Sequence, residues 1–128
     1  EGAPVLWVER VIRANDVPAA YVIDAIPQDV LVAAGGPSYE SGSVYRFLEV
    51  DCGLQLEGGV ATVSAVTADR RVARLLGVHA GEPLIRLDQL EHTADGRAVL
   101  RSSEHYVSSM FTLSVRRTRK AGSHHESA

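Results

Sequence analysis

Apolar and polar residues alternate along much of this chain of 128 residues, as they do in β-strands that bury one face. The first stretch shows the pattern clearly, because Leu6, Val8 and Ile12 fall on one face and share it with Arg10. The same reading predicts further strands along the chain. The predicted strands are residues 4–13, 19–26, 54–66, 83–92, 98–107 and 111–117.

Three other stretches carry helical signals. Pro27 begins a short helical turn. Ser43 is a good N-cap for a helix of apolar residues at helical spacing, and Gly53 fits the left-handed position after its end. Residues 67–69 cap another helix, which Gly77 closes. Strands arranged as hairpins with helices between them predict an α+β domain.

One hairpin pattern is used twice. The chain carries GAPVLWVE at residues 2–9 and GEPLIRLD at residues 81–88, which start 79 residues apart. Solenoid repeats are shorter, at roughly 20–50 residues. We therefore expect two similar hairpins within one domain, with a ligand cleft between them.

Composition and charge narrow the class of protein. The length predicts a single domain over residues 1–117 and a disordered tail over 118–128. The net charge is −3 and basic residues cluster only at 116–120, so the chain lacks the basic face of a nucleic-acid-binding domain. A single cysteine excludes a disulfide within the chain, and no apolar run is long enough to span a membrane. Because Glu1 enters directly into a strand pattern, we expect a cut point inside a longer protein.

The sequence holds no catalytic, metal-binding or cofactor-binding motif. Arg10 is the most informative polar residue, since a guanidinium on an apolar face needs an acceptor. It either forms an internal salt bridge, with Asp24 or Glu104, or clamps an anion in a cleft. Gln89 stands at the matching position of the second hairpin, and Ser43 would bring free helix amides to the same anion.

Several segments, taken together, resemble the UTRA effector domain, the C-terminal sensor of HutC-type regulators in the GntR family. The most similar is LLGVHAGEPLIRL at residues 75–87. Residues 9–27 resemble the first hairpin of that domain, and residues 43–54 resemble its segment of the form S-[LIV]-Y-x-x-L…G-L. Residues 106–115 match the closing hairpin more loosely, so the resemblance runs from residue 2 to residue 117.

The resemblance implies a chorismate-lyase-like fold with a ligand cleft, a cytoplasmic homodimer, and an N-terminal winged helix-turn-helix domain outside this chain. Such domains bind small metabolites, often sugar phosphates, and the ligand changes DNA affinity. Operator DNA is then a partner only through the missing domain, and neither a cofactor nor a membrane is implied. A small lyase-type enzyme with the same fold and a dimerisation module without a ligand are the alternative interpretations.

The resemblance implies site residues where individual positions of this chain match the binding motifs of the family. The family's anion-binding elements correspond to Arg10, Ser43, the backbone of Val44, and Tyr45. Tyr106 matches a tyrosine that lines the pocket. The complete set of predicted ligand-binding residues is Arg10, Asp24, Ser43, Val44, Tyr45, Gln89, Glu104 and Tyr106.

Other positions depart from the family pattern. Ile12 replaces a second arginine of sugar-phosphate sensors, and Val22 and Leu100 replace glutamates that hold sugar hydroxyls. Val107 and Ser109 replace the charged members of a Y-R-x-D turn. We therefore expect an anionic effector with an apolar or weakly polar body, and not a simple amino-sugar phosphate.

Overall fold

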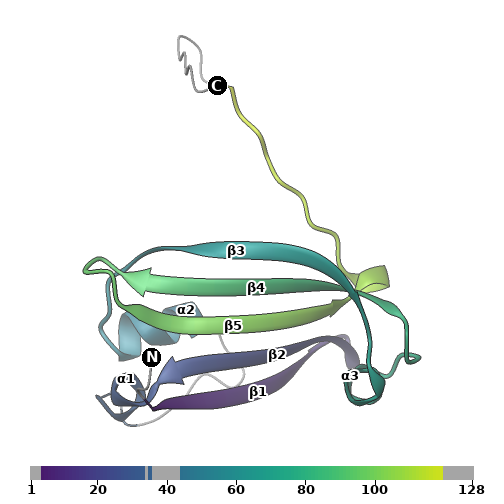
Figure 1. Ribbon diagram of the computed structural model, residues 1–128, viewed down its shortest axis with the longest axis horizontal. Coiled ribbons are helices and arrows are strands. Elements are labelled where there is room, and N and C mark those ends of the chain that lie inside the picture. The colour runs from purple at the N-terminus through teal and green to yellow at the C-terminus, as the bar shows by residue number, and fades with distance from the viewer. Residues whose placement is uncertain (1–3, 34, 36–43, 120–128) are drawn as a thin grey trace.

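A five-stranded antiparallel sheet forms the centre of the computed structural model, which describes residues 4–33, 35 and 44–119 (Figure 1). The strand order is β1-β2-β5-β4-β3. The strands are β1 (Val5–Ala14), β2 (Val17–Pro27), β3 (Leu56–Thr67), β4 (Pro83–Thr93) and β5 (Ala98–Val107). The helical segments are α1 (Gln28–Ala33), α2 (Val44–Arg46), the π-helical η1 (Phe47–Asp51), α3 (Arg70–Leu76) and the 3-10 turn η2 (Ser108–Met110). The predicted α+β class is confirmed.

The two repeated hairpins are present, but they do not face each other. Asn15 and Asp16 join β1 to β2 with φ angles of 53° and 67°, the left-handed geometry of a tight two-residue hairpin turn. The second hairpin is β4 with β5. Because β2 pairs directly with β5, the hairpins lie side by side in one sheet. The predicted cleft between two hairpin walls is therefore wrong: together the hairpins form a single surface.

Helix ends follow the signals in the sequence. The Asp69 carboxylate accepts a hydrogen bond from the Val72 amide at 2.8 Å and caps α3, and Gly77 ends that helix with a φ of 69°. The predicted helix after Ser43 corresponds to α2 followed directly by η1. Gly53 follows it with a φ of 67°, as predicted.

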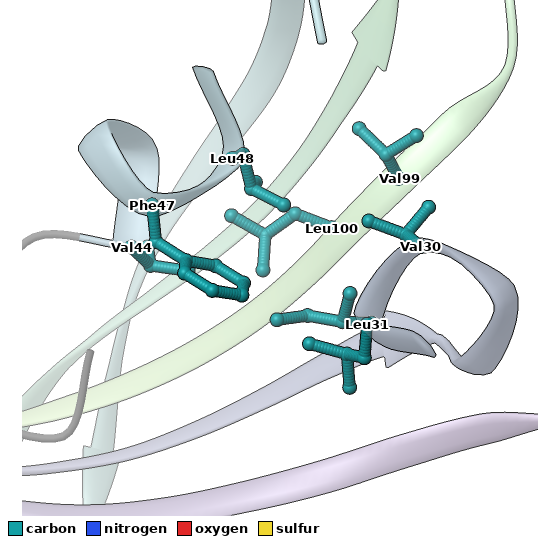
Figure 2. Packing of buried hydrophobic residues seen from close by; sticks show 8 residues of the cluster. Val30, Leu31, Val44, Phe47, Leu48, Val99 and Leu100 are labelled. Carbon is teal, nitrogen blue, oxygen red and sulfur yellow. The ribbon is translucent and has the colours of Figure 1, made fainter. Parts of the chain in front are cut away.

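Two apolar clusters cover opposite faces of the sheet at opposite ends. In the first, α1, α2 and η1 pack onto β2 and β5, and Figure 2 shows Phe47 and Leu48 beside Leu100 and Leu31. In the second, α3 packs on the other face. The buried members of the first cluster are Ile26, Val30, Leu31, Val44, Phe47, Leu48, Val99 and Leu100. Those of the second are Tyr21, Ala68, Val72, Ala73, Leu76, Leu84 and Val107.

The predicted last strand over residues 111–117 does not form. Residues 111–119 run as extended chain that belongs to no strand and leaves the sheet (Figure 1). The physical reason is that β5 already has β2 on one side and β4 on the other, so the chain that follows β5 finds no free position beside it. Most of the predicted tail, from residue 120 onward, lies outside the described residues.

Candidate functional site

Strand alternation gathers polar side chains on the sheet face that carries the first apolar cluster. Val22 of β2 lies opposite both Arg10 of β1 and Glu104 of β5, and Ser102 of β5 lies opposite Gln89 of β4. Cross-strand partners in an antiparallel sheet share a face, and α2 adds a tyrosine from above. We call this set the polar layer. It consists of Arg10, Asp24, Tyr45, Gln89, Glu91, Ser102, Glu104 and Tyr106.

A buried ion pair lies at the β1–β2 side of the polar layer. The Arg10 Nη2 donates to Oδ2 of Asp24 at 3.3 Å, and the two side chains are 13% and 0% exposed. Of the two interpretations that the sequence left open for Arg10, the internal salt bridge to Asp24 is therefore present. An effector anion that binds Arg10 would share the guanidinium with this carboxylate, which is possible because arginine offers five donors.

Glu104 is the centre of the hydrogen-bond network. Its carboxylate accepts from Gln89 Nε2 at 3.0 Å, from the Ser102 hydroxyl at 3.1 Å and from the Tyr106 hydroxyl at 2.5 Å. Three donors on one carboxylate fix the orientations of all four side chains. The network therefore presents a preorganised polar surface across β4 and β5.

Tyr45 extends the network to the helical side. Its hydroxyl donates to the Gln89 Oε1 at 2.6 Å and lies 3.4 Å from a Glu91 carboxylate oxygen. Since Gln89 accepts with its oxygen and donates with its nitrogen, Tyr45 and Glu104 are linked through one amide. Carboxylates outnumber guanidinium groups in the polar layer, so its interior favours hydrogen-bond donors and positive charge.

The surroundings of the polar layer raise the pKa of both of its tyrosines, Tyr45 and Tyr106. Burial, aided by the Glu91 and Glu104 carboxylates, raises the pKa of Tyr45 to about 12. Burial and the hydrogen bond to Glu104 also raise the pKa of Tyr106 above the ordinary tyrosine value. Both phenols are therefore held in the neutral form, in which they can donate a hydrogen bond.

These shifts predict a loss of stability at alkaline pH. A tyrosine of the unfolded chain ionises near pH 10, whereas Tyr45 in the folded chain keeps its proton to about 12. The contribution of this group is therefore complete below pH 10 and is lost as the pH rises toward 12. Urea denaturation over this range should show a shallower fall of the unfolding free energy for Tyr45→Phe than for the wild type. Identical slopes for the two proteins would contradict the shift.

The structure brings together most of the residues that the sequence singled out. Of the eight, Arg10, Asp24, Tyr45, Gln89, Glu104 and Tyr106 belong to the polar layer. The Val44 side chain belongs to the first apolar cluster, and the role predicted for its backbone in ligand binding stays a prediction. Ser43 lies outside the described residues.

Sequence reasoning missed two members of the layer. Glu91 follows Gln89 by two residues in β4, and Ser102 precedes Glu104 by two residues in β5. The alternation that places Gln89 on this face would have found both, since each lies two residues from another member of the layer. Within the described ranges, no group of three His, Cys, Asp or Glu side chains is arranged to hold a metal ion.

Comparison with known proteins places the chain in a family. The profile of the UTRA domain matches residues 1–112. The HTH-type transcriptional regulator Rv0792c of Mycobacterium tuberculosis is 32% identical over 101 residues, which cover 73% of this chain and 36% of that protein. The chain thus spans about a third of the length of this curated relative.

Solved structures show the same fold. PhnF from Mycobacterium smegmatis superposes with a TM-score of 0.84 at 24% identity, covering 93% of this chain and 52% of PhnF. A GntR-family transcriptional regulator from Enterococcus faecalis superposes with a TM-score of 0.80 at 26% identity, covering 88% and 81% of the two chains. In the described part of this chain, no helix is long and apolar enough to cross a membrane. The chain therefore belongs to the UTRA domain family, and the proteins to which it is similar are transcriptional regulators, several of them of the GntR family.

Proposed function

We propose that this chain is the effector-sensing domain of a bacterial GntR-family regulator of the HutC type. In this proposal a small metabolite binds at the polar layer, the domain works as a homodimer, and binding changes the DNA affinity of a winged-helix domain outside the chain. The similar structures include one described as the effector domain of PhnF and one described as a ligand-binding domain. Because the relatives are regulators, they favour the sensor over the lyase-type enzyme.

The observation that carries the proposal is the polar layer itself. A buried ion pair such as Arg10 with Asp24 is commonly less stabilising than an apolar pair of similar size. A few oriented polar groups within an apolar surround are, in contrast, the usual composition of a small-molecule site. The layer lies directly beside the first apolar cluster, since Tyr45 belongs to the network and also packs against that cluster.

The polar layer also changes the effector chemistry that the sequence suggested. Val22 and Leu100 are 1% and 2% exposed, so other side chains cover most of both residues. The hydrogen-bond acceptors Gln89, Glu91 and Glu104 are partly exposed on this face, beside the partly exposed apolar residues Ile85 and Leu87. We therefore propose an effector with an anionic group for Arg10 and with hydroxyl or amino groups that donate to these acceptors.

Isothermal titration calorimetry with three probes tests this chemistry. Glucosamine phosphate carries both an anion and donors, phenyl phosphate carries the anion on an apolar body, and glucosamine carries donors without the anion. We expect glucosamine phosphate to bind most tightly, because only it satisfies Arg10 and the acceptors together. Tighter binding of phenyl phosphate would restore the apolar body predicted from the sequence, and no binding of either phosphate would overturn the anion site.

Arg10→Gln provides the matching mutational test. Loss of a charge-assisted hydrogen bond is expected to weaken phosphate binding by about ten- to a hundredfold. Arg13→Gln is the matched control, since Arg13 lies on the same strand, is exposed and contacts the Asp16 carbonyl at 3.4 Å. Equal affinities of the two variants, with both folded by circular dichroism, would remove Arg10 from the site.

Coupling to DNA is tested in the intact regulator. The probe that binds best should change operator affinity in a gel-shift titration, and Arg10→Gln should remove that change while preserving operator affinity without the probe. Unchanged operator affinity at saturating probe would contradict the sensor function, even if the probe binds.

A further inference from the structure

The sheet face opposite the polar layer carries α3 at one end and is open toward the other. Figure 1 shows α3 near the turn between β1 and β2, and its apolar side chains pack there on Tyr21, Leu84 and Val107. The helices α1 and α2 cover the opposite face, so they leave the rest of this one exposed. One row of cross-strand partners crosses the open region on all five strands. We call it the open row, and in strand order it consists of Trp7, Ala25, Arg101, Leu90 and Val60.

The open row exposes large apolar side chains to solvent. Trp7 is 63% exposed, Val60 65% and Leu90 38%. Ala25 lies between Trp7 and Arg101 and is small and buried, so the row has a notch between an indole ring and a guanidinium group. Adjoining exposed apolar side chains of this kind are typical of a binding surface.

Arg101 is the charged member of the open row. It is exposed, and within the described part of the chain no carboxylate lies within salt-bridge distance of its guanidinium. Arg86 on the same face, in contrast, pairs with Asp88 at 2.9 Å. The Arg101 guanidinium therefore keeps its planar set of donors for an anion from outside the chain, and a carboxylate matches that geometry with two parallel hydrogen bonds.

Two hollows of this face meet at Arg101, which lines both of them. The first has a volume of about 210 Å³ and is mostly apolar, with Val5, Trp7 and Pro27 in its lining. The second has a volume of about 440 Å³ and a more polar lining that includes Asp88. Small-molecule sites usually have volumes of roughly 300–1,000 Å³. The two hollows together therefore provide the space of an ordinary ligand site, with the guanidinium at their junction.

We propose that the open row is a second ligand site, separate from the polar layer, and that it binds a small aromatic carboxylic acid. The ring of the acid lies against the Trp7 indole above Ala25, and its carboxylate pairs with Arg101. Trp7 and Arg101 are two strands apart, so their Cα atoms are separated by roughly 10 Å, which leaves room for one ring system between the two side chains. Stacking on the indole and pairing with the guanidinium then both contribute to affinity.

Fluorine NMR tests the site directly, because Trp7 is the single tryptophan of the 128-residue chain. Protein labelled with 5-fluorotryptophan has one fluorine resonance, which we expect to shift saturably when 2-naphthoate is added. 2-Naphthylmethanol has the same ring without the charge, and acetate has the charge without the ring. Each should bind more weakly than 2-naphthoate by about tenfold or more. A resonance that does not move with up to about 1 mM 2-naphthoate, or equal affinity for the alcohol, would overturn the proposal.

Three arginine variants, each checked for folding by circular dichroism, locate the carboxylate. Arg101→Gln should weaken 2-naphthoate binding by about ten- to a hundredfold, since it removes a charge-assisted pair. Arg13→Gln removes another exposed arginine, at the far end of β1, and should leave the affinity unchanged. Arg10→Gln should also leave it unchanged, because Arg10 and Trp7 lie on opposite faces of β1. Affinity that is lost in Arg10→Gln and kept in Arg101→Gln would place the acid at the polar layer and overturn the second site.

Trp7→Leu tests the stacking, with calorimetry in place of the fluorine signal. The variant keeps an apolar side chain but loses the ring, so we expect about tenfold weaker binding of 2-naphthoate. Cyclohexanecarboxylate has a saturated ring that stacks poorly, and its weaker binding should differ little between the variant and the wild type. Equal affinity of both proteins for 2-naphthoate would remove Trp7 from the site and overturn the proposal.

Discussion

Asp24→Ala is expected to lower the free energy of unfolding by about 3–5 kcal/mol. Asp24 is 0% exposed and its carboxylate accepts from Arg10 at 3.3 Å, so the substitution leaves a largely buried guanidinium without this carboxylate. Removal of one partner of a buried ion pair is among the most destabilising changes in a core. Urea denaturation followed by circular dichroism measures the loss.

A second variant separates loss of the pair from loss of packing. Replacing both partners, with Arg10→Met and Asp24→Leu, removes the charges together and should recover most of the lost stability. Asp88→Ala is the matched control, because the Asp88 carboxylate pairs with Arg86 at 2.9 Å but both side chains are about 40% exposed. We expect that control to cost about 1 kcal/mol or less. Equal losses of unfolding free energy for Asp24→Ala and Asp88→Ala would contradict the expectation that burial of the ion pair makes its loss more costly.

Local signals were sufficient to predict most of the fold. Asp69 and Gly77 mark the ends of α3, because capping depends on a few neighbouring residues. Asn15 and Asp16 tolerate the left-handed backbone that a two-residue hairpin turn requires, so the first hairpin is visible in the sequence. Alternation then gives the strands, since it depends only on the two faces of a sheet.

The predictions that were wrong concern which strands become neighbours in the sheet. Residues 111–117 alternate like a strand, but the alternation does not reveal that both sides of β5 are already occupied. The predicted cleft between the hairpins failed for the same reason, since only the pairing of β2 with β5 shows that the hairpins form one surface. Strand order is a non-local property, and a local pattern does not encode it.

The candidate site was predictable to the extent that it follows alternation. Arg10 stood out as a charge on an apolar face, and the same rule would have placed Glu91 beside Gln89. The hydrogen-bond and ion-pair partners of each polar group were harder to predict from the sequence. The sequence left Asp24 and Glu104 as equal candidates for Arg10, and the register that brings Ser102, Gln89 and Tyr106 to Glu104 appears only in the structure.

Glu104→Ala is expected to lower the free energy of unfolding by about 2–4 kcal/mol, because hydrogen-bond donors of Gln89, Ser102 and Tyr106 lose their common acceptor. The expected loss of free energy is smaller than the summed cost of leaving three buried donors without an acceptor. Glu104 is only partly buried, so water can accept some of these hydrogen bonds in its place. Denaturation at neutral pH measures it. Glu57→Ala, at an exposed acid of β3, is the control and should change stability by less than about 0.5 kcal/mol.

The same variant has a second consequence that simple loss of packing would not produce. Burial is the largest cause of the raised pKa of Tyr106, and the hydrogen bond and charge of Glu104 add to it, so Glu104→Ala should lower that pKa part of the way toward the ordinary tyrosine value. A raised pKa stabilises the folded state below pH 10 and loses that effect as the pH rises further, so the variant should show a weaker alkaline dependence of stability than the wild type. Phenolate absorbance during a pH titration reports the shift when a Tyr106→Phe variant identifies the contribution of Tyr106 among the four tyrosines. An unchanged Tyr106 titration in a folded Glu104→Ala protein would mean that burial alone holds the proton and that the Glu104 carboxylate adds nothing to the shift.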